Sequence, residues 1–145
     1  MKHFNVRIYG ILIEKDKVLI SDEYIKGKHI TKFPGGGLEF GEGTLDCVKR
    51  EFKEELNLQI EVISHFYTTD FFVASAFSNQ SQVISIYYLV KPLEPINVKI
   101  KEKPFDFEHK KEGAQAFRWL ELKKLSADDL TFIIDKHEVE LLTQN

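Results

Sequence analysis

The pattern of apolar and polar residues predicts that the chain opens with a β-hairpin. Apolar, largely β-branched residues are dense over residues 5–14, and this character resumes over residues 17–21 after a polar pair at 15–16. Two such runs separated by a short polar turn are typical of antiparallel strands. Residues 22–34 are mixed and charged and end in Pro34, which favours a loop with room for one short strand.

A helix is expected from about Leu45 to Leu56. Leu45, Val48, Phe52 and Leu56 recur at spacings of three and four residues and therefore form one apolar stripe. Thr44, directly before them, is a residue type that caps helix N-termini. The stripe is expected to pack this helix against the predicted sheet.

The middle of the chain predicts a buried strand between more polar segments. Residues 59–67 alternate as a strand does, and residues 83–90 are almost continuously apolar. A continuous apolar run is typical of a central strand that is covered on both faces, so helices should flank this sheet. Residues 68–81 place three phenylalanines beside small polar residues, which fits a loop or a strand pair lining a pocket.

The last third of the chain predicts two further strands and a final helix. Residues 97–101 alternate as an edge strand with outward lysines, residues 104–113 form a charged loop, and residues 116–120 return as a strand. Ser126 with Asp129 resembles a capping box. An amphipathic helix should follow it, marked by Ile133, Ile134, His137 and Leu141.

Length and composition add few constraints beyond one domain. The chain has 145 residues, of which 43% are hydrophobic, and this is enough for a single domain over residues 1–145 with a core of its own. The net charge of −3 argues against a protein that grips the phosphate backbone of a nucleic acid. A small charged ligand is compatible with it.

The sequence also bears on compartment and membrane association. Cys47 is the single cysteine, so no internal disulfide can form, and a reducing, cytoplasmic location is expected. Arg7 interrupts the N-terminal segment where a signal peptide would need its apolar region, and no apolar run is long enough to span a membrane. The expectation is therefore a protein that does not associate with membranes.

The chemistry is concentrated between Gly36 and Leu58, where a glycine-rich loop precedes the predicted helix. Successive helical residues turn by about 100°, so Glu51, Glu54 and Glu55 share one flank of the helix. Carboxylate oxygens select hard cations such as magnesium, manganese or calcium. The alternative is a solvated acidic face, because like charges at these spacings cost a helix only about 0.2 to 0.5 kcal/mol per pair.

The order of residues in this stretch resembles the signature of the Nudix hydrolase family, the Nudix box. That signature is Gly, five residues, Glu, seven residues, Arg-Glu, an apolar residue, any residue, Glu-Glu, any residue, Gly and an apolar residue. The corresponding positions hold Gly36, Glu42, Arg50, Glu51, Phe52, Glu54, Glu55, Asn57 and Leu58. Asn57 is the one departure, because the family has glycine there. Asparagine is the usual second choice for the left-handed backbone that should end this helix.

The resemblance implies a Nudix-type α/β/α sandwich around a mixed β-sheet. It further implies that Glu51, Glu54 and Glu55 ligate a divalent metal, Mg²⁺ with Mn²⁺ as the alternative, near the backbone carbonyl of Gly36. Glu42 would support this site, and Arg50 would orient the glutamates through ion pairs.

The implied reaction is hydrolysis of the diphosphate linkage of a nucleoside diphosphate joined to another moiety. A nucleoside triphosphate or a nucleotide sugar would fit. Such a reaction needs a general base, for which Glu55 is the first candidate and Glu112 the second. Arg7, Lys32 and Phe71 are the candidates for binding the substrate. For each of them the alternative is a purely structural or solvated side chain.

A second hypothesis is a Nudix-fold module that binds a nucleotide metabolite as a sensor without hydrolysing it. Such modules commonly lose carboxylates of the box, whereas this chain retains all of them. Members of the family often dimerise, so a homodimer is a further expectation from the resemblance.

Overall fold

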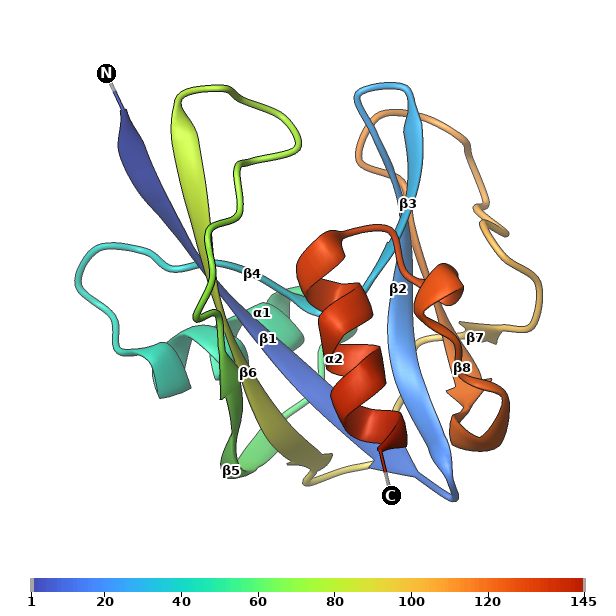
Figure 1. Ribbon diagram of the computed structural model, residues 1–145. Helices are drawn as coiled ribbons and strands as arrows, with labels where there is room; N and C mark the ends of the chain where they lie inside the picture. Colours follow the sequence, from blue (N-terminus) through green and yellow to red (C-terminus); the bar gives the residue numbers. More distant parts are fainter. Residues whose placement is uncertain (1, 145) are drawn as a thin grey trace. The chain divides into compact units, whose positions relative to one another are not determined.

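The computed structural model describes residues 2–144 and divides the chain into two compact units (Figure 1). The first unit comprises Met1–Leu12 with Pro34–Val98, and the second comprises Ile13–Phe33 with Lys99–Asn145. Each unit has its own strands and one α-helix, and the two are described in turn. The single domain over residues 1–145 stays a prediction.

The first unit contains a mixed sheet in the order β4-β1-β6-β5. Strand β1 pairs in parallel with β6 and antiparallel with β4, while β6 pairs antiparallel with β5. The strands are β1 (His3–Glu14, in this unit through Leu12), β4 (Gly35–Gly37), β5 (Ile60–Thr68) and β6 (Ser81–Pro92). The α/β class with a mixed sheet and the central position of the strand at residues 83–90 are therefore confirmed.

Helix α1 (Thr44–Leu56) begins one residue earlier than expected, and Thr44 does not cap it. Gly43 occupies the N-cap position and contributes no side-chain bond, while the Thr44 hydroxyl lies 2.7 Å from the hydroxyl of Tyr88. Thr44 is already the first helical residue, so its side chain is used to bind strand β6 instead.

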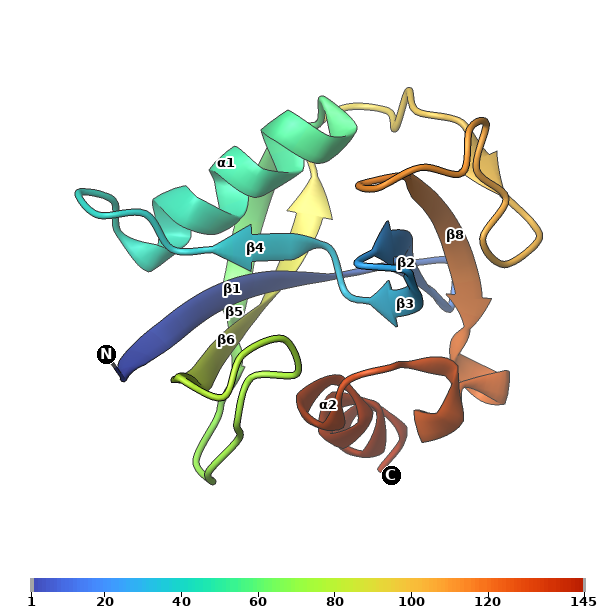
Figure 2. The same cartoon turned by 90° about the horizontal axis from the view of Figure 1, so that it is seen from above.

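The buried face of α1 differs from the predicted stripe at one end. Val48, Phe52 and Leu56 are buried as expected, whereas Leu45 is exposed and Cys47 is buried in its place. The first turn of α1 follows the exposed loop at residues 39–43, and its outermost apolar position therefore stays in solvent. The helix runs alongside β4 (Figure 2).

Close packing of α1 on β1 depends on Gly10. A Cβ atom at this position would lie 2.4 Å from the Phe52 ring and 3.2 Å from Val90. Since real Cβ contacts are much longer, any larger residue would force the ring of Phe52 out of its place. Gly10 thereby sets the height of the helix above the sheet.

The end of α1 confirms the expectation for Asn57. This residue is left-handed, with φ 49° and ψ 42°, and its N–H donates to the Lys53 carbonyl at 3.0 Å. The next N–H, that of Leu58, donates to the Phe52 carbonyl at 3.4 Å. Asparagine thus provides the helix end for which the family signature uses glycine.

Replacing Asn57 by glycine is expected to leave the free energy of unfolding unchanged or to raise it by up to about 1 kcal/mol, because glycine adopts the left-handed region without a Cβ penalty. Urea denaturation of the parent and of Asn57→Gly measures the difference. A clear drop in stability would contradict this assignment, and Asn57→Val, which should destabilise, serves as the control.

The second unit has strands in the order β3-β2-β8-β7. The opening hairpin is confirmed, since Ile13 and Glu14 at the end of β1 pair antiparallel with Val18 and Lys17. The strands are β2 (Lys17–Ile25), β3 (Lys28–Lys32), β7 (Ile100–Lys101) and β8 (Gln115–Glu121). Strand β7 is shorter than the edge strand predicted at residues 97–101.

The prediction that residues 22–34 are mostly loop is wrong. Strand β2 continues to Ile25 and forms a second hairpin with β3, which is closed by Lys26 and Gly27. Both turn residues have positive φ, 50° and 76°, as two-residue hairpin turns that follow the natural twist of the strands require. The Lys-Gly pair was the available sequence signal.

Asp22 connects the strands of this unit to the charged loop at residues 104–113, whose lack of regular structure is confirmed. Its buried carboxylate accepts bonds from Arg118 at 2.6 and 3.0 Å and from the Thr31 hydroxyl at 2.7 Å. It also accepts the backbone N–H of Phe105 at 3.1 Å. One carboxylate thus fixes the start of the loop against β2, β3 and β8.

The predicted capping box is present but caps a different helix. The Ser126 hydroxyl accepts the N–H of Asp128 at 3.2 Å, and the Asp129 carboxylate accepts the N–H of Ser126 at 2.9 Å. This box begins the 3₁₀-helix η2 (Ala127–Asp129), which follows the 3₁₀-helix η1 (Leu122–Lys124). The final helix α2 (Ile133–Thr143) starts four residues later.

Helix α2 buries acidic residues that the predicted stripe did not include. Its buried residues are Ile134, Asp135, Glu138 and Val139, whereas Ile133 is exposed and His137 and Leu141 are half-buried. The expected stripe is therefore wrong at its first position, and two carboxylates occupy much of the covered face. No helix within residues 2–144 is both long and apolar enough to cross a membrane.

Candidate metal centre

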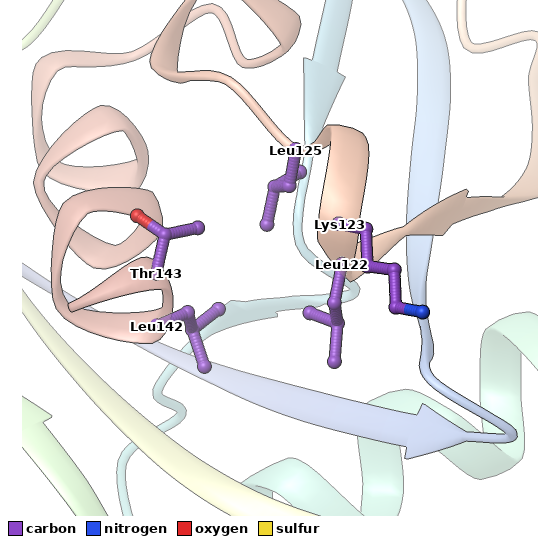
Figure 3. A pocket seen from close by; sticks show the side chains of 5 residues that line it. All are labelled: Leu122, Lys123, Leu125, Leu142 and Thr143. Carbon is purple, nitrogen blue, oxygen red and sulfur yellow. The ribbon is translucent and has the colours of Figure 1, made fainter. Parts of the chain in front are cut away.

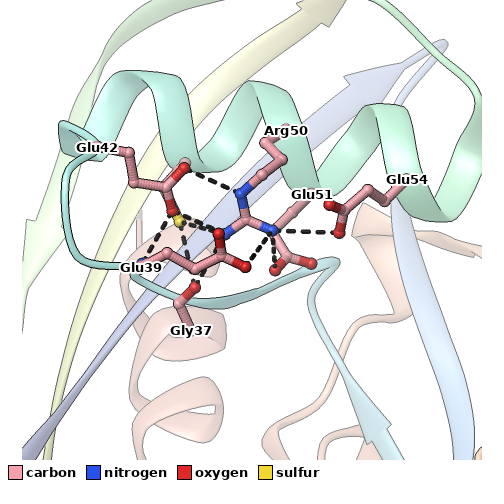
Figure 4. A network of polar contacts seen from close by, with 7 residues as sticks. Gly37, Glu39, Glu42, Arg50, Glu51 and Glu54 are labelled. Carbon is pink, nitrogen blue, oxygen red and sulfur yellow. Dashed lines mark hydrogen bonds and ion pairs between the residues drawn. The ribbon is translucent and has the colours of Figure 1, made fainter.

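The carboxylates of the Nudix-like stretch gather around one guanidinium group in the first unit (Figure 4). Glu51 and Glu54 project from the same side of α1 as Arg50, and Glu42 approaches from the loop that precedes the helix. A helix that is anchored by its buried apolar face presents these polar residues on its remaining surface. Helical spacing thus brings Glu51 and Glu54 beside Arg50.

Glu42 is bound by Arg50 through two hydrogen bonds. The arginine Nε donates to Oε2 at 2.9 Å and Nη2 donates to Oε1 at 2.7 Å. The Nη2 group also donates to the Gly37 carbonyl at 3.1 Å, and the Cys47 thiol is directed at the same carbonyl at 3.6 Å. This arrangement joins the glycine strand, the loop and the helix at one point.

These contacts determine the charges in the centre. The hydrogen bonds from Arg50, followed by the one from the Glu39 N–H, lower the pKa of Glu42 to about 2. The pairing with Glu42 raises the pKa of Arg50. Burial, followed by the neighbouring Glu42, raises the pKa of the Cys47 thiol to about 12, so this cysteine remains a protonated, inert packing residue.

The third nitrogen of Arg50 faces several carboxylates at once. Nη1 lies 3.1 Å from Glu51 Oε1, 3.1 Å from Glu54 Oε2 and 3.6 Å from Glu39 Oε1. Glu39 was not among the predicted site residues, because it precedes the helix and the helical spacing argument does not include it. It lies three residues before Glu42, and its N–H donates to Glu42 Oε1 at 2.9 Å.

Gly36 allows the Glu51 carboxylate to lie against strand β4. A Cβ atom at this position would lie 2.5 Å from Oε1 and 2.8 Å from Oε2 of Glu51. The carboxylate therefore fills the space that a side chain at position 36 would take. This close approach explains why the signature begins with glycine.

Glu55, one turn after Glu51, is half-buried, and its Oε2 atom is shielded from solvent. Together with Glu51 and Glu54 it supplies oxygen donors only, the set that Mg²⁺ and Mn²⁺ prefer. Within residues 2–144 no three acidic, histidine or cysteine side chains are already arranged as a closed metal-binding group, and Arg50 lies among the box carboxylates. The oxygen-only donors of these glutamates and the space that Gly36 leaves for the Glu51 carboxylate fit a divalent ion. The Arg50 guanidinium already places positive charge at the same carboxylates.

Two of the predicted substrate-binding residues lie in the same unit. Arg7 on β1 pairs with Gly37 on β4, and a Cβ on Gly37 would lie 3.6 Å from Arg7 Nη1, so the Arg7 guanidinium lies beside the glycine strand. Its Nε donates to the Tyr9 hydroxyl at 2.8 Å. Phe71 lies in the loop after β5 and is partly exposed.

The other two predicted residues belong to the second unit. Lys32 is buried, pairs with Glu23 at 3.1 Å and donates to the Phe33 carbonyl at 3.3 Å. Glu112 accepts the Lys26 N–H at 2.7 Å, which ties the charged loop to the β2–β3 turn. Their roles in binding and catalysis stay predictions.

A separate hollow of about 360 Å³ lies in the second unit (Figure 3). It is lined by Leu122, Lys123, Leu125, Leu142 and Thr143, and the Lys123 amine points away from Leu142 and Thr143. The described residues that line it include no carboxylate, so it is unsuited to the metal chemistry of α1.

Comparison with known proteins identifies this arrangement. A family model described as the NUDIX domain matches residues 1–140, which is nearly the whole chain. The chain belongs to the Nudix family. The predicted class, a Nudix pyrophosphohydrolase acting on phosphorus anhydrides, is thereby confirmed, and so is the Nudix-type α/β fold.

Solved structures share this Nudix fold at low sequence identity. A MutT NUDIX hydrolase from Burkholderia pseudomallei is 16% identical with a TM-score of 0.73, and the match covers 96% of this chain and 98% of that one. A NUDIX hydrolase from Nitrosomonas europaea is 17% identical with a TM-score of 0.71, covering 95% and 87%. An ADP-ribose pyrophosphatase from Streptococcus suis is 16% identical with a TM-score of 0.58, covering 96% and 89%. A search of curated proteins found no match.

Nudix hydrolases generally use divalent metal ions and act on small nucleotide derivatives, so both expectations are supported at this level. The choice of Mg²⁺, the individual roles of the site residues, the homodimer and the cytoplasmic location stay predictions.

Proposed function

We propose that this Nudix domain hydrolyses, with Mg²⁺, the diphosphate linkage of a nucleoside diphosphate joined to another moiety. Mn²⁺ is the alternative cofactor. The observation that supports this most directly is the position of the Glu51 carboxylate against Gly36. The Glu54 carboxylate lies nearby, and both carboxylates contact the Arg50 guanidinium. A charged oxygen cluster of this kind suits a reaction in which phosphate charge must be neutralised.

Glu51, Glu54 and Glu55 would hold the metal together with the backbone carbonyl of Gly36. A bound divalent ion polarises phosphoryl oxygens and lowers the pKa of coordinated water. Glu42 and Arg50 keep the loop and the helix in register through their two hydrogen bonds. This rigidity holds the carboxylates in place before substrate arrives.

The remaining residues of the chain supply the proton acceptor and the contacts to substrate. Glu55 accepts the proton of the attacking water, and Glu112 is the second candidate for this role. Arg7, beside the glycine strand, provides positive charge for phosphate oxygens, and the Phe71 ring offers a stacking surface for a base. Lys32 is the weakest of the substrate-binding candidates, because its amine is buried and paired with Glu23.

A phosphate-release screen tests this function. Purified protein is incubated with Mg²⁺ and with nucleoside triphosphates, nucleotide sugars, ADP-ribose and dinucleoside polyphosphates, because the names of structural neighbours include both an ADP-ribose pyrophosphatase and a UDP-X diphosphatase. We expect turnover of at least one class and a loss of about tenfold or more in Glu54→Gln.

The control for this screen is Glu61→Gln, which removes an exposed carboxylate from β5 of the same unit. It should retain the activity of the parent. If no substrate is turned over, or if Glu54→Gln works as well as the parent, the metal-dependent hydrolase is excluded. Binding of a nucleotide without turnover would instead favour the sensor hypothesis.

Replacing Gly36 by alanine is expected to lower metal affinity and turnover by about 10- to 100-fold while the protein remains folded. The three atoms nearest to the new Cβ all belong to the flexible end of Glu51, so its carboxylate would be displaced first. Isothermal titration calorimetry with Mg²⁺ measures the metal affinity, and a thermal melt checks that the variant remains folded. Gly43→Ala is the control, since its Cβ would meet nothing closer than 3.7 Å. Unchanged metal affinity in Gly36→Ala would contradict the proposed position of Glu51.

A further inference from the structure

Arg50 uses the two sides of its guanidinium group differently. Nε and Nη2 bind Glu42 at 2.9 and 2.7 Å, and Nη2 also binds the Gly37 carbonyl at 3.1 Å. These partners are directional and well shielded, since the Glu42 side chain is only 15% exposed. Paired donors in this geometry make the strongest arginine–carboxylate contacts. This side of Arg50 therefore has a structural anchor.

The Nη1 side is crowded with acceptors. Nη1 has two hydrogens, whereas carboxylates of Glu51, Glu54 and Glu39 all lie within 3.1 to 3.6 Å of it. Two of these side chains are largely in solvent, with Glu54 58% and Glu39 66% exposed. Exposed ion pairs are weak and exchange readily. The contacts of Nη1 with Glu54 and Glu39 are therefore weak, whereas the contact with Glu51, whose side chain is only 13% exposed, is the one for which a metal must compete.

We propose that Arg50 is an internal counter-ion which a divalent metal partly displaces. In the metal-free protein, Nη1 offsets the repulsion between the box carboxylates. When the metal binds, Nη1 leaves Glu51 and Glu54, whereas Nε and Nη2 stay on Glu42 and Gly37. Arg50 and Glu42 are then positioning residues. Glu42 binds Arg50 and does not coordinate the metal. This inference rests on the proposed metal-dependent function.

The physical reason is competition for the same oxygens. A guanidinium group and a metal ion on the same carboxylates share their negative charge and repel each other, and a doubly charged ion supplies more positive charge to the cluster than Nη1 does. The exchange leaves the anchor on Glu42 untouched, because Glu42 Oε1 is additionally fixed by the Glu39 N–H at 2.9 Å. Glu42 and the loop that carries it therefore remain in place both with and without metal.

Nitrogen-15 NMR of the arginine side chains tests this exchange directly. The chain has three arginines, Arg7, Arg50 and Arg118, so assignment is simple, and Arg118, bound to Asp22 in the other unit, is an internal reference. As Mg²⁺ is added, the Nη1 hydrogens of Arg50 should exchange faster with solvent and its Nη1 group should rotate more freely. The Nε–H of Arg50 and all signals of Arg118 should stay unchanged.

The outcomes separate this inference from the proposed function. If Mg²⁺ shifts the backbone signals of Glu51 and Glu54 but leaves Nη1 of Arg50 protected, the exchange is wrong while the metal site stands. Simultaneous release of Nε and Nη1 would also overturn the exchange. If Mg²⁺ changes no signal of α1, the metal-dependent function itself fails.

Metal affinity in two matched variants gives a second test. Arg50→Gln and Lys49→Gln each remove one positive charge from α1, but Lys49 is exposed, and no ion pair within the described residues joins it to the carboxylate cluster. Calorimetric titration should show that Mg²⁺ or Mn²⁺ binds Arg50→Gln more tightly than Lys49→Gln, by about threefold to tenfold. Because Arg50→Gln also loses the bonds to Glu42, its melting temperature is compared with that of the parent. Weaker metal binding by an Arg50→Gln protein that melts like the parent would mean that Arg50 only orients the ligands, and this would overturn the competition.

Discussion

Replacing Glu55 by glutamine is expected to lower kcat by about 10² to 10⁴-fold, a larger loss than Glu54→Gln should cause. Glu55 is proposed both to ligate the metal and to accept the proton of the attacking water, so the variant loses a ligand charge and the base together. Glu54 is proposed as a ligand alone. The measurement is the steady-state rate for the best substrate of the screen, with Mg²⁺ at saturation.

Glu112→Gln is the comparison that decides the identity of the base. Its carboxylate accepts the Lys26 N–H at 2.7 Å, and a glutamine at this position keeps that bond through its carbonyl oxygen. We expect this variant to retain most of the activity of the parent. If instead kcat falls by about 10² to 10⁴-fold in Glu112→Gln and not in Glu55→Gln, Glu112 is the base and the charged loop carries it.

Glu138 is expected to make the protein less stable as the pH rises. Its side chain is fully buried on α2, and neither carboxyl oxygen has a hydrogen-bond partner among the described residues. Burial, followed by the charge of Asp135 one turn away, raises the pKa of Glu138 to about 8 from an ordinary value of 4.5. Between these two pKa values, Glu138 keeps its proton in the folded protein and has lost it in the unfolded chain.

The sign follows from this difference in bound protons. Between the unfolded and folded pKa values the folded state binds one proton more, so the free energy of unfolding falls by about 1.4 kcal/mol per pH unit. Over the window from about pH 4.5 to 8 the expected loss is about 3 to 5 kcal/mol, and the curve should flatten above that range. The full contribution is present below pH 4.5.

Glu138→Gln should remove this pH dependence. The amide is neutral at every pH, so the variant should match the parent near pH 4.5 and exceed its free energy of unfolding at pH 8 and above. Urea denaturation at a series of pH values measures both curves. Glu140→Gln, an exposed glutamate on the same helix, is the control and should follow the parent. Parallel curves for the parent and Glu138→Gln would contradict the buried, proton-holding Glu138.

Local patterns predicted those parts of the fold that depend on neighbouring residues. The central strand at residues 83–90 became β6, and the periodic stripe with Asn57 at its end became α1 with a left-handed terminus. Hydrophobic periodicity and helix-end chemistry act over a few residues, so a single sequence contains them. The second hairpin was missed because its signal, Lys26-Gly27, lies within a charged segment that resembles a loop.

Other errors came from contacts between residues distant in the sequence. Thr44 is of a residue type that caps helices, but its hydroxyl lies beside that of Tyr88. Leu45 continues the apolar stripe in the sequence, but in the structure it is exposed. The buried acidic face of α2 contradicts the usual preference of carboxylates for solvent, which is the basis of sequence patterning. Only the packed neighbours of each side chain decide such cases.

In the stretch from Gly36 to Leu58, some features follow from the sequence alone and others only from the tertiary structure. By itself the sequence determined the family signature, the oxygen-only chemistry and the common helix flank of Glu51 and Glu54, because helical geometry converts spacing into direction. Tertiary structure decided that Gly36 leaves room for the Glu51 carboxylate and that Glu39 joins the cluster. It also placed Arg50 between Glu42 on one side and the carboxylates of Glu51, Glu54 and Glu39 on the other. These features require the loop and the strand to fold back onto the helix, and spacing along the chain does not specify that approach.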